Sequence, residues 1–481
     1  MRVEHTGHEV RSADAQAGTD FTGKRVHLIG IGGSGMCGAA SMLVGLGAIV
    51  TGSDLQPFDG MGDLVSRGVA VSIGHGADRL HRDVDLVVIS AAIPPGNPEL
   101  TTAIARDVQI IQYAELLGEL MTLREGVAIA GTHGKSSTTA MCAHVFREAG
   151  LEPSFIVGAR SEQLRGSSAA GAGRHFIVES CEFNRSFLHL HPTSAAVLNV
   201  EPDHLDCYTD LDEIVEAFSC FCSNVHPDGL LICSAEDRWA LKAAESAHAR
   251  VLTFGFEEQA DWRARNLTSD CGRFSFDVVF RGSHVLSTRL SVPGRYNVSN
   301  ALATVGLAHE SGVGPEVIAR ALAGYAGISR RLSFRGQGRG VVILDDYAHH
   351  PTEVRVTLEA ARHRYLPKRM WVIFQPHQCS RTRHFLEEFA GSFDLADEVI
   401  VPDIFLAREE CGEQARAGAQ QLVSRITDRG GKATYLPSLG AITEYLEAGI
   451  TEGDVVLTMG AGDVWKVADG LVERVCPVSG V

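Results

Sequence analysis

The amino-acid sequence predicts an α/β protein made of three successive units. From Lys24 onward, short apolar runs alternate with amphipathic stretches, a pattern typical of parallel sheets with helices on both faces. The alternation pauses at residues 123–126 and starts again after residues 327–340. A chain of 481 residues also has room for about three domains of ~150 residues each.

Two Rossmann-like units are expected to flank a central one. We place the N-terminal Rossmann-like unit at residues 21–122, a central P-loop-type ATPase sheet at residues 123–332 and a C-terminal Rossmann-like unit at residues 333–481. Residues 251–292 predict a small antiparallel part within the central unit. Residues 1–20 are polar and predict a disordered tail, with a cleaved targeting segment as the alternative.

The expected strands follow the apolar runs, and the expected helices follow the amphipathic stretches between them. Strands are predicted within residues 25–33, 48–54, 85–93, 126–130, 175–180, 194–204, 229–237, 341–351, 370–377, 398–405, 433–437 and 454–463. Residues 36–47 predict a helix, and residues 293–312 predict a loop that leads into a long helix. The Gly/Ser/Ala-rich stretch 161–175 predicts a loop.

Charge and cysteine content restrict the possible partners. The formal net charge of −16 argues against a nucleic acid or an anionic membrane surface, because phosphate groups are met by an excess of Lys and Arg. We find no apolar run of about 18 residues that would span a bilayer. The 11 cysteines include no C-x-x-C pair, which predicts reduced thiols in a cytoplasmic protein and disfavours a structural zinc site.

The first glycine-rich turn, residues 30–35, has the pattern G-x-G-x-x-G between a predicted strand and a predicted helix. Glycines permit a tight turn, and the helix N-terminus offers unpaired amides to a phosphate. Asp54 ends the next strand, where an acidic group would meet a ribose hydroxyl. The pattern does not distinguish NAD, FAD or a UDP-sugar. A tight turn that binds nothing, with Asp54 as a solvated strand end, is the alternative.

The second glycine-rich turn, Gly131-Thr132-His133-Gly134-Lys135-Ser136, resembles a P-loop that lacks two loop residues. Its backbone amides would wrap phosphates, Lys135 would neutralise the β- and γ-phosphates, and the Ser136 hydroxyl would ligate Mg²⁺. A surface lysine in a turn is the alternative. One chain with two such turns predicts ATP in one and a phosphate-bearing substrate in the other.

Acidic and histidine residues follow two central strands and suit Mg²⁺ near a P-loop. They are Glu179, Glu182, Glu201, Asp203, His204 and Asp206. A bridging cation would offset the repulsion between a γ-phosphate and a substrate carboxylate. Helix-cap and turn roles are the alternative, most of all for Glu182, Asp203 and Asp206.

Further motifs, taken with the P-loop-like turn and the N-terminal VHLIGIGGSGMCG, resemble the Mur ligase family. They are ESCEFNRSFL, NVEPDHLDCY, PGRYNVSNALA, DDYAHHPTEV, FQPHQCSRTR and MGAGDVW, in this order. The resemblance covers about residues 21–475 and is greatest to the branch that joins L-alanine to UDP-N-acetylmuramate.

This resemblance implies a cytoplasmic ATP-dependent ligase of peptidoglycan precursor synthesis that uses Mg²⁺ or Mn²⁺. ATP would phosphorylate the lactyl carboxylate of UDP-N-acetylmuramate, because a carboxylate is a poor electrophile until it carries a good leaving group. The amine of L-alanine would then attack the acyl phosphate, and a tetrahedral intermediate would expel phosphate. The implied partners are these three substrates, with no nucleic acid or membrane, and the implied assembly is a monomer or homodimer.

The resemblance also assigns roles to individual residues. ATP binding falls to Gly131, Thr132, His133, Gly134, Lys135, Ser136, Ser137, Asn297, Asn300, Arg331 and Asp346. Metal binding falls to Ser136, Glu179 and His204, and catalysis to Lys135, Glu179, His204 and His350. Substrate binding falls to Gly30, Gly32, Ser34, Gly35, Asp54, His75 and Ser90 in the N-terminal unit and to His377, Arg381 and Arg383 in the C-terminal unit.

Several of these residues also have ordinary structural explanations. Asn297 and Asn300 could cap a helix, Asp346 could end a strand in solvent, and His350 could be a surface imidazole. Arg381 and Arg383 could line a helix N-terminus, but positive charge is poorly placed there, which favours a ligand role. The sequence departs from the family pattern in three places: Cys181 replaces an Asp of many relatives, Gln378 an Arg of some, and Ser136 a Thr.

Three other functions remain open on the sequence alone. A sister ligase would attach a preformed peptide to the same sugar nucleotide in cell-wall recycling. An NAD-dependent oxidoreductase would explain the first glycine turn but not the second. A nucleotide-binding regulatory module would have lost catalysis, which the presence of Lys135, Glu179 and His204 disfavours.

Overall fold

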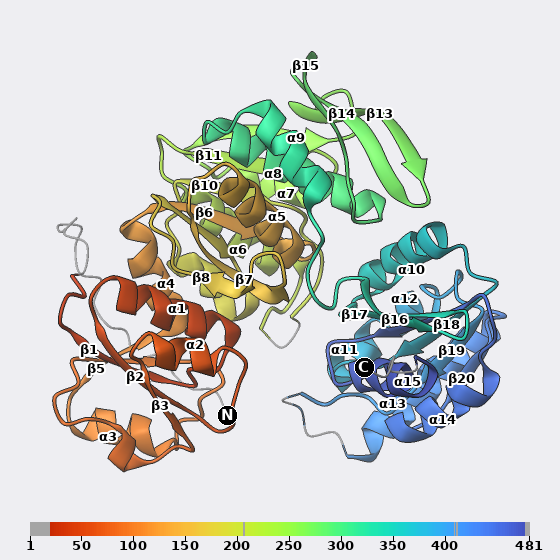
Figure 1. Ribbon diagram of the computed structural model, residues 1–481, viewed down its shortest axis with the longest axis horizontal. Helices are drawn as coiled ribbons and strands as arrows, with labels where there is room; N and C mark the ends of the chain where they lie inside the picture. The colour runs from red at the N-terminus through yellow and green to blue at the C-terminus, as the bar shows by residue number, and fades with distance from the viewer. Residues whose placement is uncertain (1–19, 205–206, 408, 410–411, 477–481) are drawn as a thin grey trace, which may run out of the picture.

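The computed structural model describes residues 20–476 except 205–206, 408 and 410–411. The described residues form three sheets, and Figure 1 shows one lobe around each. The predicted α/β class is confirmed. Each sheet lies inside one of the three predicted units, whose limits at residues 122 and 332 remain a prediction. The predicted tail lies outside the described residues except for Asp20.

The N-terminal lobe is a parallel sheet in the order β3-β2-β1-β4-β5. Its elements are β1 (Arg25–Ile29), α1 (Ser34–Gly45), β2 (Ile49–Asp54), α2 (Met61–Ser66), β3 (Ala70–Ile73), the 3₁₀ turn η1 (Ala77–Arg79), β4 (Leu86–Ile89), α3 (Pro98–Ala105), β5 (Gln109–Gln112) and α4 (Tyr113–Thr122). The strand order reverses between β1 and β4. The turn after β1 therefore lies at a topological switch point, where open α/β sheets bind ligands at their carboxyl edge.

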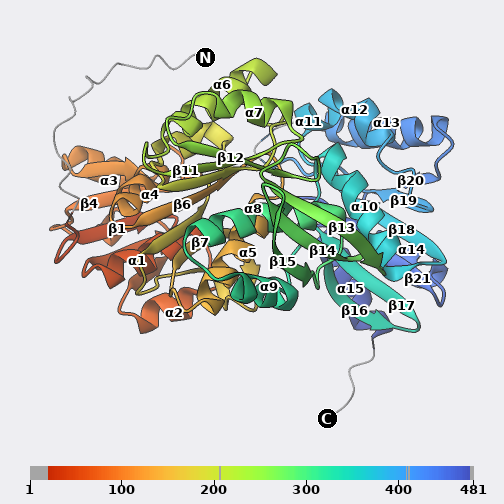
Figure 2. The same ribbon diagram turned by 90° about the horizontal axis from the view of Figure 1, so that it is seen from above.

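The central lobe has the strand order β15-β14-β13-β12-β11-β10-β6-β9-β7-β8. Its strands are β6 (Glu125–Ala130), β7 (Ser154–Ser161), β8 (Gly166–Ala169), β9 (His175–Glu179), β10 (Ser194–Val197), β11 (Leu230–Ser234), β12 (Arg250–Gly255), β13 (Trp262–Asp270), β14 (Arg273–Phe280) and β15 (Ser283–Arg289). Its helices are α5 (Lys135–Glu148), η2 (Phe183–His189), α6 (Leu211–Ser223), α7 (Arg238–Ala244), α8 (Arg295–Glu310) and α9 (Pro315–Gly324). Figure 2 shows α6 and α7 on one face and α5, α8 and α9 on the other.

Two details of this lobe differ from the sequence prediction. Residues 253–256 were expected among antiparallel strands, but 253–255 belong to β12, which is parallel to β11. The predicted loop 161–175 contains β8, which pairs antiparallel with β7. The small residues of β8 have low strand propensity, and pairing with β7 together with packing against α1 outweighs it.

The C-terminal lobe has the strand order β16-β17-β21-β18-β19-β20, with β16 antiparallel to β17 and the rest parallel. Its strands are β16 (Ser333–Gly338), β17 (Val341–Asp346), β18 (Arg369–Phe374), β19 (Glu398–Val401), β20 (Ala433–Tyr435) and β21 (Asp454–Met459). Its helices are α10 (Pro351–Tyr365), α11 (Cys379–His384), α12 (Leu386–Ala390), α13 (Glu413–Asp428), α14 (Leu439–Gly449) and α15 (Trp465–Val475).

The N-terminal and central lobes share one apolar core. This core joins Leu28 and Leu43 of the first sheet region to Ile156 and Phe176 of the second. Helix α1 lies directly on β7 and β8, and a Cβ added to Gly38 would be 2.6 Å from Ser168. The buried core residues of the C-terminal lobe form separate clusters. The first two lobes are therefore one packed block, to which the C-terminal lobe is attached.

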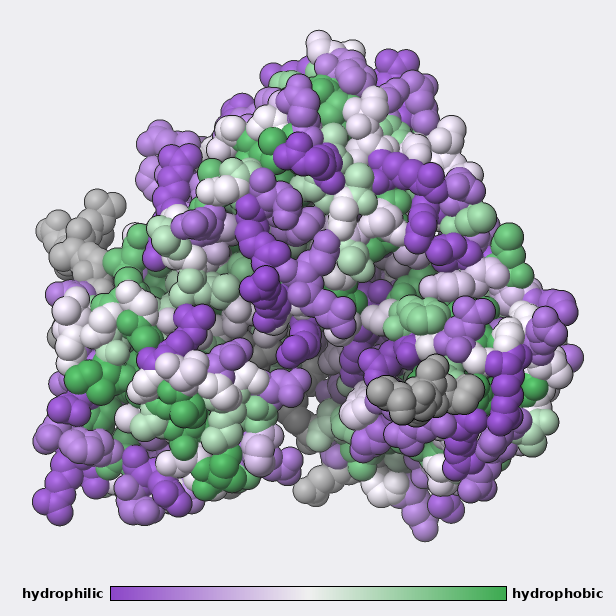
Figure 3. All heavy atoms as spheres, in the orientation of Figure 1, coloured by the Kyte–Doolittle hydropathy of each residue, from purple (hydrophilic) through white to green (hydrophobic). Residues whose placement is uncertain are grey.

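The surface between the lobes is hollowed. Figure 3 shows a hollow between the N-terminal lobe at lower left and the C-terminal lobe at lower right. Both lobes meet the central lobe above this hollow (Figure 1). Among the described residues, no helix combines the length and apolar character needed to cross a bilayer.

The buried His175 predicts loss of stability in acid. His175 is 1% exposed, and burial lowers the pKa of this imidazole against the opposing effect of Glu125, whose Oε2 lies 3.5 Å from Nε2. The unfolded chain then binds a proton near pH 6.5 that the folded chain does not. Stability is thus retained above pH ~6.5 and falls as the pH drops, by at most about 1.4 kcal/mol per pH unit from this group.

When the pH is lowered from 7.5 to 5.5, we expect the melting temperature of the His175→Phe variant to fall less than that of the unaltered protein. The matched control is His284→Phe, because the His284 side chain is 59% exposed. Equal pH slopes for all three proteins in scanning calorimetry would contradict the assignment.

Candidate nucleotide and substrate site

The first glycine turn follows β1 and is held by the end of β2. The amides of Gly30 and Ile31 donate to the carbonyl of Ser53 at 2.9 and 3.0 Å. The amide of Gly32 donates to Asp54 Oδ2 at 2.9 Å. A Cβ on Gly32 would lie 2.6 Å from Phe58, so the turn requires glycine at this position.

The other predicted substrate residues of the N-terminal lobe gather at the same edge. His75 follows β3, and Ser90 follows β4, 3.1 Å from the position of a Cβ on Gly30. Ser34 begins α1, and its side chain is outside what the structure describes. A Cβ on Gly35 would lie 2.1 Å from the Tyr113 hydroxyl, so Tyr113, which the sequence prediction missed, covers the start of α1.

The second glycine turn connects β6 to α5 and is pinned to the segment after β10. The amide of Thr132 donates to the carbonyl of Asn199 at 3.0 Å, and the amide of His133 donates to Asn199 Oδ1 at 2.7 Å. The amide of Glu201 donates to Thr132 Oγ1 at 2.8 Å. Gly134 has a φ of +81°, which favours glycine. The turn is therefore a fixed loop at a helix N-terminus, a geometry that suits phosphate.

Lys135 bends back over this loop. Its Nζ donates to the carbonyls of Gly131 and Thr132 at 2.6 and 3.0 Å and lies 2.9 Å from Glu182 Oε1. Burial alone would lower the pKa of Lys135, but the Glu182 carboxylate outweighs burial and raises it above its ordinary value. Lys135 is thus a firmly charged cation above the predicted phosphate loop.

Ser136, the residue after Lys135, meets Glu179 at the end of β9. Ser136 Oγ donates to Glu179 Oε1 at 3.0 Å, and the amide of Gly158 donates to Glu179 Oε2 at 2.6 Å. A hydroxyl and a carboxylate are oxygen donors of the kind that Mg²⁺ prefers. The structure therefore brings together two of the three residues predicted to bind metal.

His204, the third predicted metal residue, lies beside Glu182. Its Nε2 is 3.5 Å from Glu182 Oε1, and Glu182 Oε2 lies 2.9 Å from Lys135 Nζ. Cys181 lies within the same group of possible ligands, but its side chain is exposed and a thiol is a softer ligand than Mg²⁺ prefers. The donors of the kind that Mg²⁺ takes are therefore the oxygens of Ser136, Glu179 and Glu182 and the imidazole of His204.

Seven of the eleven predicted ATP residues line one cavity of about 820 Å³ between the central and C-terminal lobes, and Gly131, Thr132, Lys135 and Ser136 are not on its wall. Those on its wall are His133, Gly134, Ser137, Asn297, Asn300, Arg331 and Asp346. This volume lies within the ~300–1,000 Å³ range of nucleotide-sized ligand sites. Asn300 Nδ2 donates to Asn297 Oδ1 at 3.2 Å. Both asparagines lie inside α8, whose N-cap is Gly294, so neither caps the helix.

Asp346 is buried at the cavity wall. Its two oxygens accept the amides of Leu332 and Ala348 at 2.6 and 2.7 Å. Burial raises the pKa of this carboxyl to about 6 against the lowering effect of Arg331. The strand-end alternative, a solvated carboxylate, is wrong because Asp346 is only 3% exposed.

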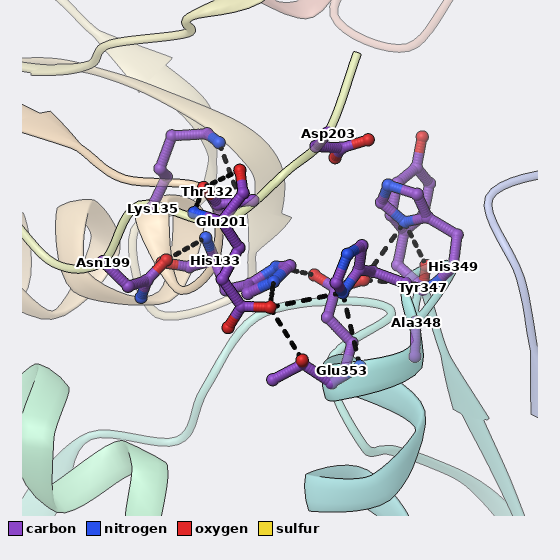
Figure 4. A network of polar contacts seen from close by, with 12 residues as sticks. Thr132, His133, Lys135, Asn199, Glu201, Asp203, Tyr347, Ala348, His349 and Glu353 are labelled. Atoms are coloured by element: carbon purple, nitrogen blue, oxygen red, sulfur yellow. Dashed lines mark hydrogen bonds and ion pairs between the residues drawn. The ribbon is translucent and has the colours of Figure 1, made fainter. Parts of the chain in front are cut away.

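Glu353 is the most important residue that the sequence prediction missed. It lies in the first turn of α10, 3.4 Å from His133 Nδ1 and 3.3 Å from His349 Nδ1 (Figure 4). It is also 3.3 Å from Arg331 Nη1. These charges hold its pKa well below the ordinary value although burial opposes them. The only sequence signal was an acidic residue after Pro351 in a predicted helix start.

His133 connects this carboxylate to a second one. Its Nε2 is 3.6 Å from Glu201, which also accepts a hydrogen bond from Thr352 Oγ1 at 2.8 Å. Burial alone would lower the pKa of His133, but Glu201 and Glu353 outweigh burial and raise it to about 9. The imidazolium therefore links the phosphate loop to the C-terminal lobe at neutral pH (Figure 4).

Two residues with predicted roles in the C-terminal lobe, His350 and Arg383, lie in surroundings that the sequence did not indicate, and their roles remain predictions. His350 is 3% exposed, its Nε2 donates to the carbonyl of Pro202 at 3.2 Å, and its Nδ1 accepts the amide of Thr352 at 3.3 Å. Burial and His133 lower its pKa to about 4. His350 is thus neither a surface imidazole nor a free proton carrier, because both ring nitrogens are engaged. Arg383 is exposed and lines a small groove between α11 and α13, away from the large cavity.

Arg381 and His377 face the central lobe. Arg381 Nη2 lies 2.5 Å from Asp203 Oδ1, and both side chains are about 5% exposed. Arg381 Nη1 also contacts His377 Nδ1 at 3.2 Å. The pair with Asp203 joins the two lobes and explains why a cation is tolerated in a short helix. Asp206 lies outside the described residues.

Sequence profiles of three domains match the chain. The Mur ligase family catalytic domain matches residues 25–125, the Mur ligase middle domain residues 129–308, and the Mur ligase glutamate ligase domain residues 330–462. A UDP-N-acetylmuramate–L-alanine ligase from Acetivibrio thermocellus is 38% identical over 449 residues, which cover 93% of this chain and 95% of that protein.

Two solved structures resemble the whole chain. The UDP-N-acetylmuramate–alanine ligase MurC from Thermotoga maritima has a TM-score of 0.78 and 27% identity, covering 94% of this chain and 98% of its own. A murein peptide ligase from Psychrobacter arcticus has a TM-score of 0.69 and 25% identity, covering 95% and 100%. The resemblance expected from the motifs is confirmed across nearly the entire sequence, and the chain belongs to the Mur ligase family.

Proposed function

We propose that this chain is an ATP-dependent ligase that joins L-alanine to the lactyl carboxylate of UDP-N-acetylmuramate in peptidoglycan precursor synthesis. The main support is the group formed by Lys135, Ser136 and Glu179 beside a cavity of about 820 Å³. The same packed block also contains the glycine turn of the N-terminal lobe. The Acetivibrio relative, at 38% identity over 93% of the chain, carries the name of this activity.

The chemistry requires ATP, which ligases of this family use, to activate a carboxylate. Lys135 would bind the transferring phosphoryl group as a point charge, since its own pairing with Glu182 is the contact a phosphate would replace or share. Ser136, Glu179 and His204 would hold a divalent cation, which when bound supplies positive charge between two anions. The acyl phosphate then gives the carboxyl carbon a leaving group.

The carboxyl edge of the sheet in the N-terminal lobe would bind the sugar nucleotide, and the C-terminal lobe would bind L-alanine. The glycine turn, Asp54 and His75 offer amides and polar groups for a diphosphate and a ribose. His377 and Arg381 lie where the C-terminal lobe meets the central lobe. Because Arg381 is already paired with Asp203, it would bind the amino-acid carboxylate while keeping Asp203 as a second partner. We further propose that the protein acts in the cytoplasm as a monomer or homodimer.

A preformed peptide as acceptor is the second candidate function, because the Psychrobacter murein peptide ligase has a TM-score of 0.69 with this chain. The NAD-dependent oxidoreductase has lost its support, since it explains neither the phosphate loop nor membership in a ligase family. The regulatory alternative is disfavoured by the intact Lys135, Ser136 and Glu179 group.

The acceptor decides between the two ligases. We expect phosphate release from ATP with Mg²⁺ only when UDP-N-acetylmuramate and L-alanine are both present, with glycine and L-serine slower. The measurement is coupled phosphate release across L-alanine, glycine, L-serine and an alanine-led tripeptide. Release with the tripeptide alone would move the chain to the recycling function, and no release in any combination would refute a ligase.

The phosphate loop makes a direct prediction. Lys135→Ala is expected to reduce ATP turnover at least 100-fold, because the developing phosphoryl charge loses a preorganised partner worth about 3 kcal/mol or more. Lys242→Ala, on the exposed face of α7, is the matched control and should turn over normally. A folded Lys135→Ala protein with near-normal turnover would disprove the role of this loop.

The polar junction of the C-terminal lobe predicts closure on substrate binding. The lobe joins the block through ion pairs and hydrogen bonds, including Arg381–Asp203, which can rearrange more readily than a shared apolar core. We expect the radius of gyration to fall when a non-hydrolysable ATP analogue and UDP-N-acetylmuramate are both added, measured by small-angle X-ray scattering. Each ligand alone is the control, and an unchanged profile with both would count against closure.

A further inference from the structure

A fully buried carboxylate lies beneath the substrate edge of the N-terminal lobe. Glu99, in the first turn of α3, is 0% exposed and accepts hydrogen bonds on both oxygens. Oε2 accepts from His27 Nε2 at 2.8 Å and from Ser53 Oγ at 2.7 Å. Oε1 accepts from the amide of Gly76 at 3.0 Å and lies 3.3 Å from His75 Nδ1.

The carboxylate is charged in the folded protein. Burial raises the pKa of Glu99, but the hydrogen bonds from His27, Ser53 and Gly76 outweigh burial and lower it below the ordinary value. An ionised carboxylate only accepts hydrogen bonds, so the nitrogens of His27 and His75 that face it carry protons. On His27 the other nitrogen is satisfied by Thr51 Oγ1 at 2.7 Å.

Ser53 connects the Glu99 carboxylate to the glycine turn after β1. Its hydroxyl donates to Glu99 and therefore accepts from His75 Nδ1, at 2.9 Å. Its carbonyl accepts the amides of Gly30 and Ile31, which shape the turn. One residue thus joins the buried charge to the two parts of the substrate edge, the turn after β1 and the histidine after β3.

His75 is held in one tautomer as a result. Its Nδ1 keeps the proton, and within the described part of the chain its Nε2 makes no hydrogen bond. The His75 side chain is 10% exposed at the carboxyl edge of the sheet. A fixed ring with one free nitrogen at this edge is suited to recognise a polar ligand group.

Stability does not account for this network. Taking a carboxylate out of water is costly, and well-packed apolar residues often replace buried ionic groups without loss of stability. Helix α3 already has its own cap, because Asn97 Oδ1 accepts the amides of Glu99 and Leu100 at 2.9 and 3.1 Å, and Pro98 follows it. The glutamate side chain is therefore not needed to begin the helix.

We infer that Glu99 is a positioning residue for the sugar nucleotide: through Ser53 it fixes the glycine turn, and directly it orients His75 with Nε2 available to the ligand. This inference rests on the proposed function and names the residue that arranges its first substrate site. Glu99 itself is buried and does not touch the ligand.

The test compares Glu99→Gln and Ser53→Ala with the control Asn97→Ala. Glu99→Gln keeps the side-chain volume but turns an amide toward donors, and Ser53→Ala keeps the carbonyl that holds the turn. Asn97→Ala weakens the start of the same helix without removing the carboxylate. For each full-length protein the measurements are kcat, KM for UDP-N-acetylmuramate and for ATP, calorimetric binding of UDP-N-acetylmuramate without ATP, melting temperature, and the His75 tautomer by ¹⁵N NMR.

We expect Glu99→Gln to raise KM and Kd for UDP-N-acetylmuramate about tenfold, with kcat and KM for ATP within twofold, and to mix the two His75 tautomers. Ser53→Ala should show the same pattern more weakly. Asn97→Ala should lower the melting temperature and leave KM and the tautomer unchanged. If Glu99→Gln only lowers the melting temperature, as Asn97→Ala does, the inference is overturned. An unaltered protein that neither binds nor turns over UDP-N-acetylmuramate would instead overturn the proposed function.

Discussion

The ion pairs of Glu353 with His133 and Arg331 determine where the C-terminal lobe meets the phosphate loop. They place a buried carboxylate between a residue of the loop and a residue of the cavity wall, so both are held in one arrangement. The loop is fixed from its other side by Asn199 and Glu201. Because Glu201 and Glu353 raise the pKa of His133 to about 9, its contacts with both carboxylates keep their charge at neutral pH.

The two interfaces of the central lobe differ in chemistry, and their properties follow from that. The N-terminal interface is a continuous apolar core, which tolerates little displacement because close-packed side chains lose contacts at once. The C-terminal interface includes ion pairs and hydrogen bonds between the lobes, whose polar groups can take a ligand as a new partner if the ligand replaces the contact that is lost. The sugar-nucleotide edge and the phosphate loop thus keep a fixed spacing while the third lobe is free to adjust.

Features that depend on neighbours in sequence could be predicted from the sequence. The turns at residues 30–35 and 131–136, the acidic Glu179 after its strand and the alternation of strands and helices are all local. Glu353, Glu99 and the pairing of Arg381 with Asp203 could not be predicted, because each depends on residues brought together from distant segments. His350 is a second example of this limit. Its sequence context suggested a catalytic role, but the sequence did not indicate that a carbonyl 148 residues away accepts a hydrogen bond from its ring.

The apolar core shared by the first two lobes also bears on how the chain unfolds. The predicted units end at residues 122 and 332, yet only the second limit lies beside a break between buried clusters. A fragment that ends at residue 122 would leave the inner face of α1 and α4 in water, since these helices pack on β7, β8 and η2. We therefore expect the N-terminal and central lobes to unfold together as one cooperative unit and the C-terminal lobe to be the second, smaller unit.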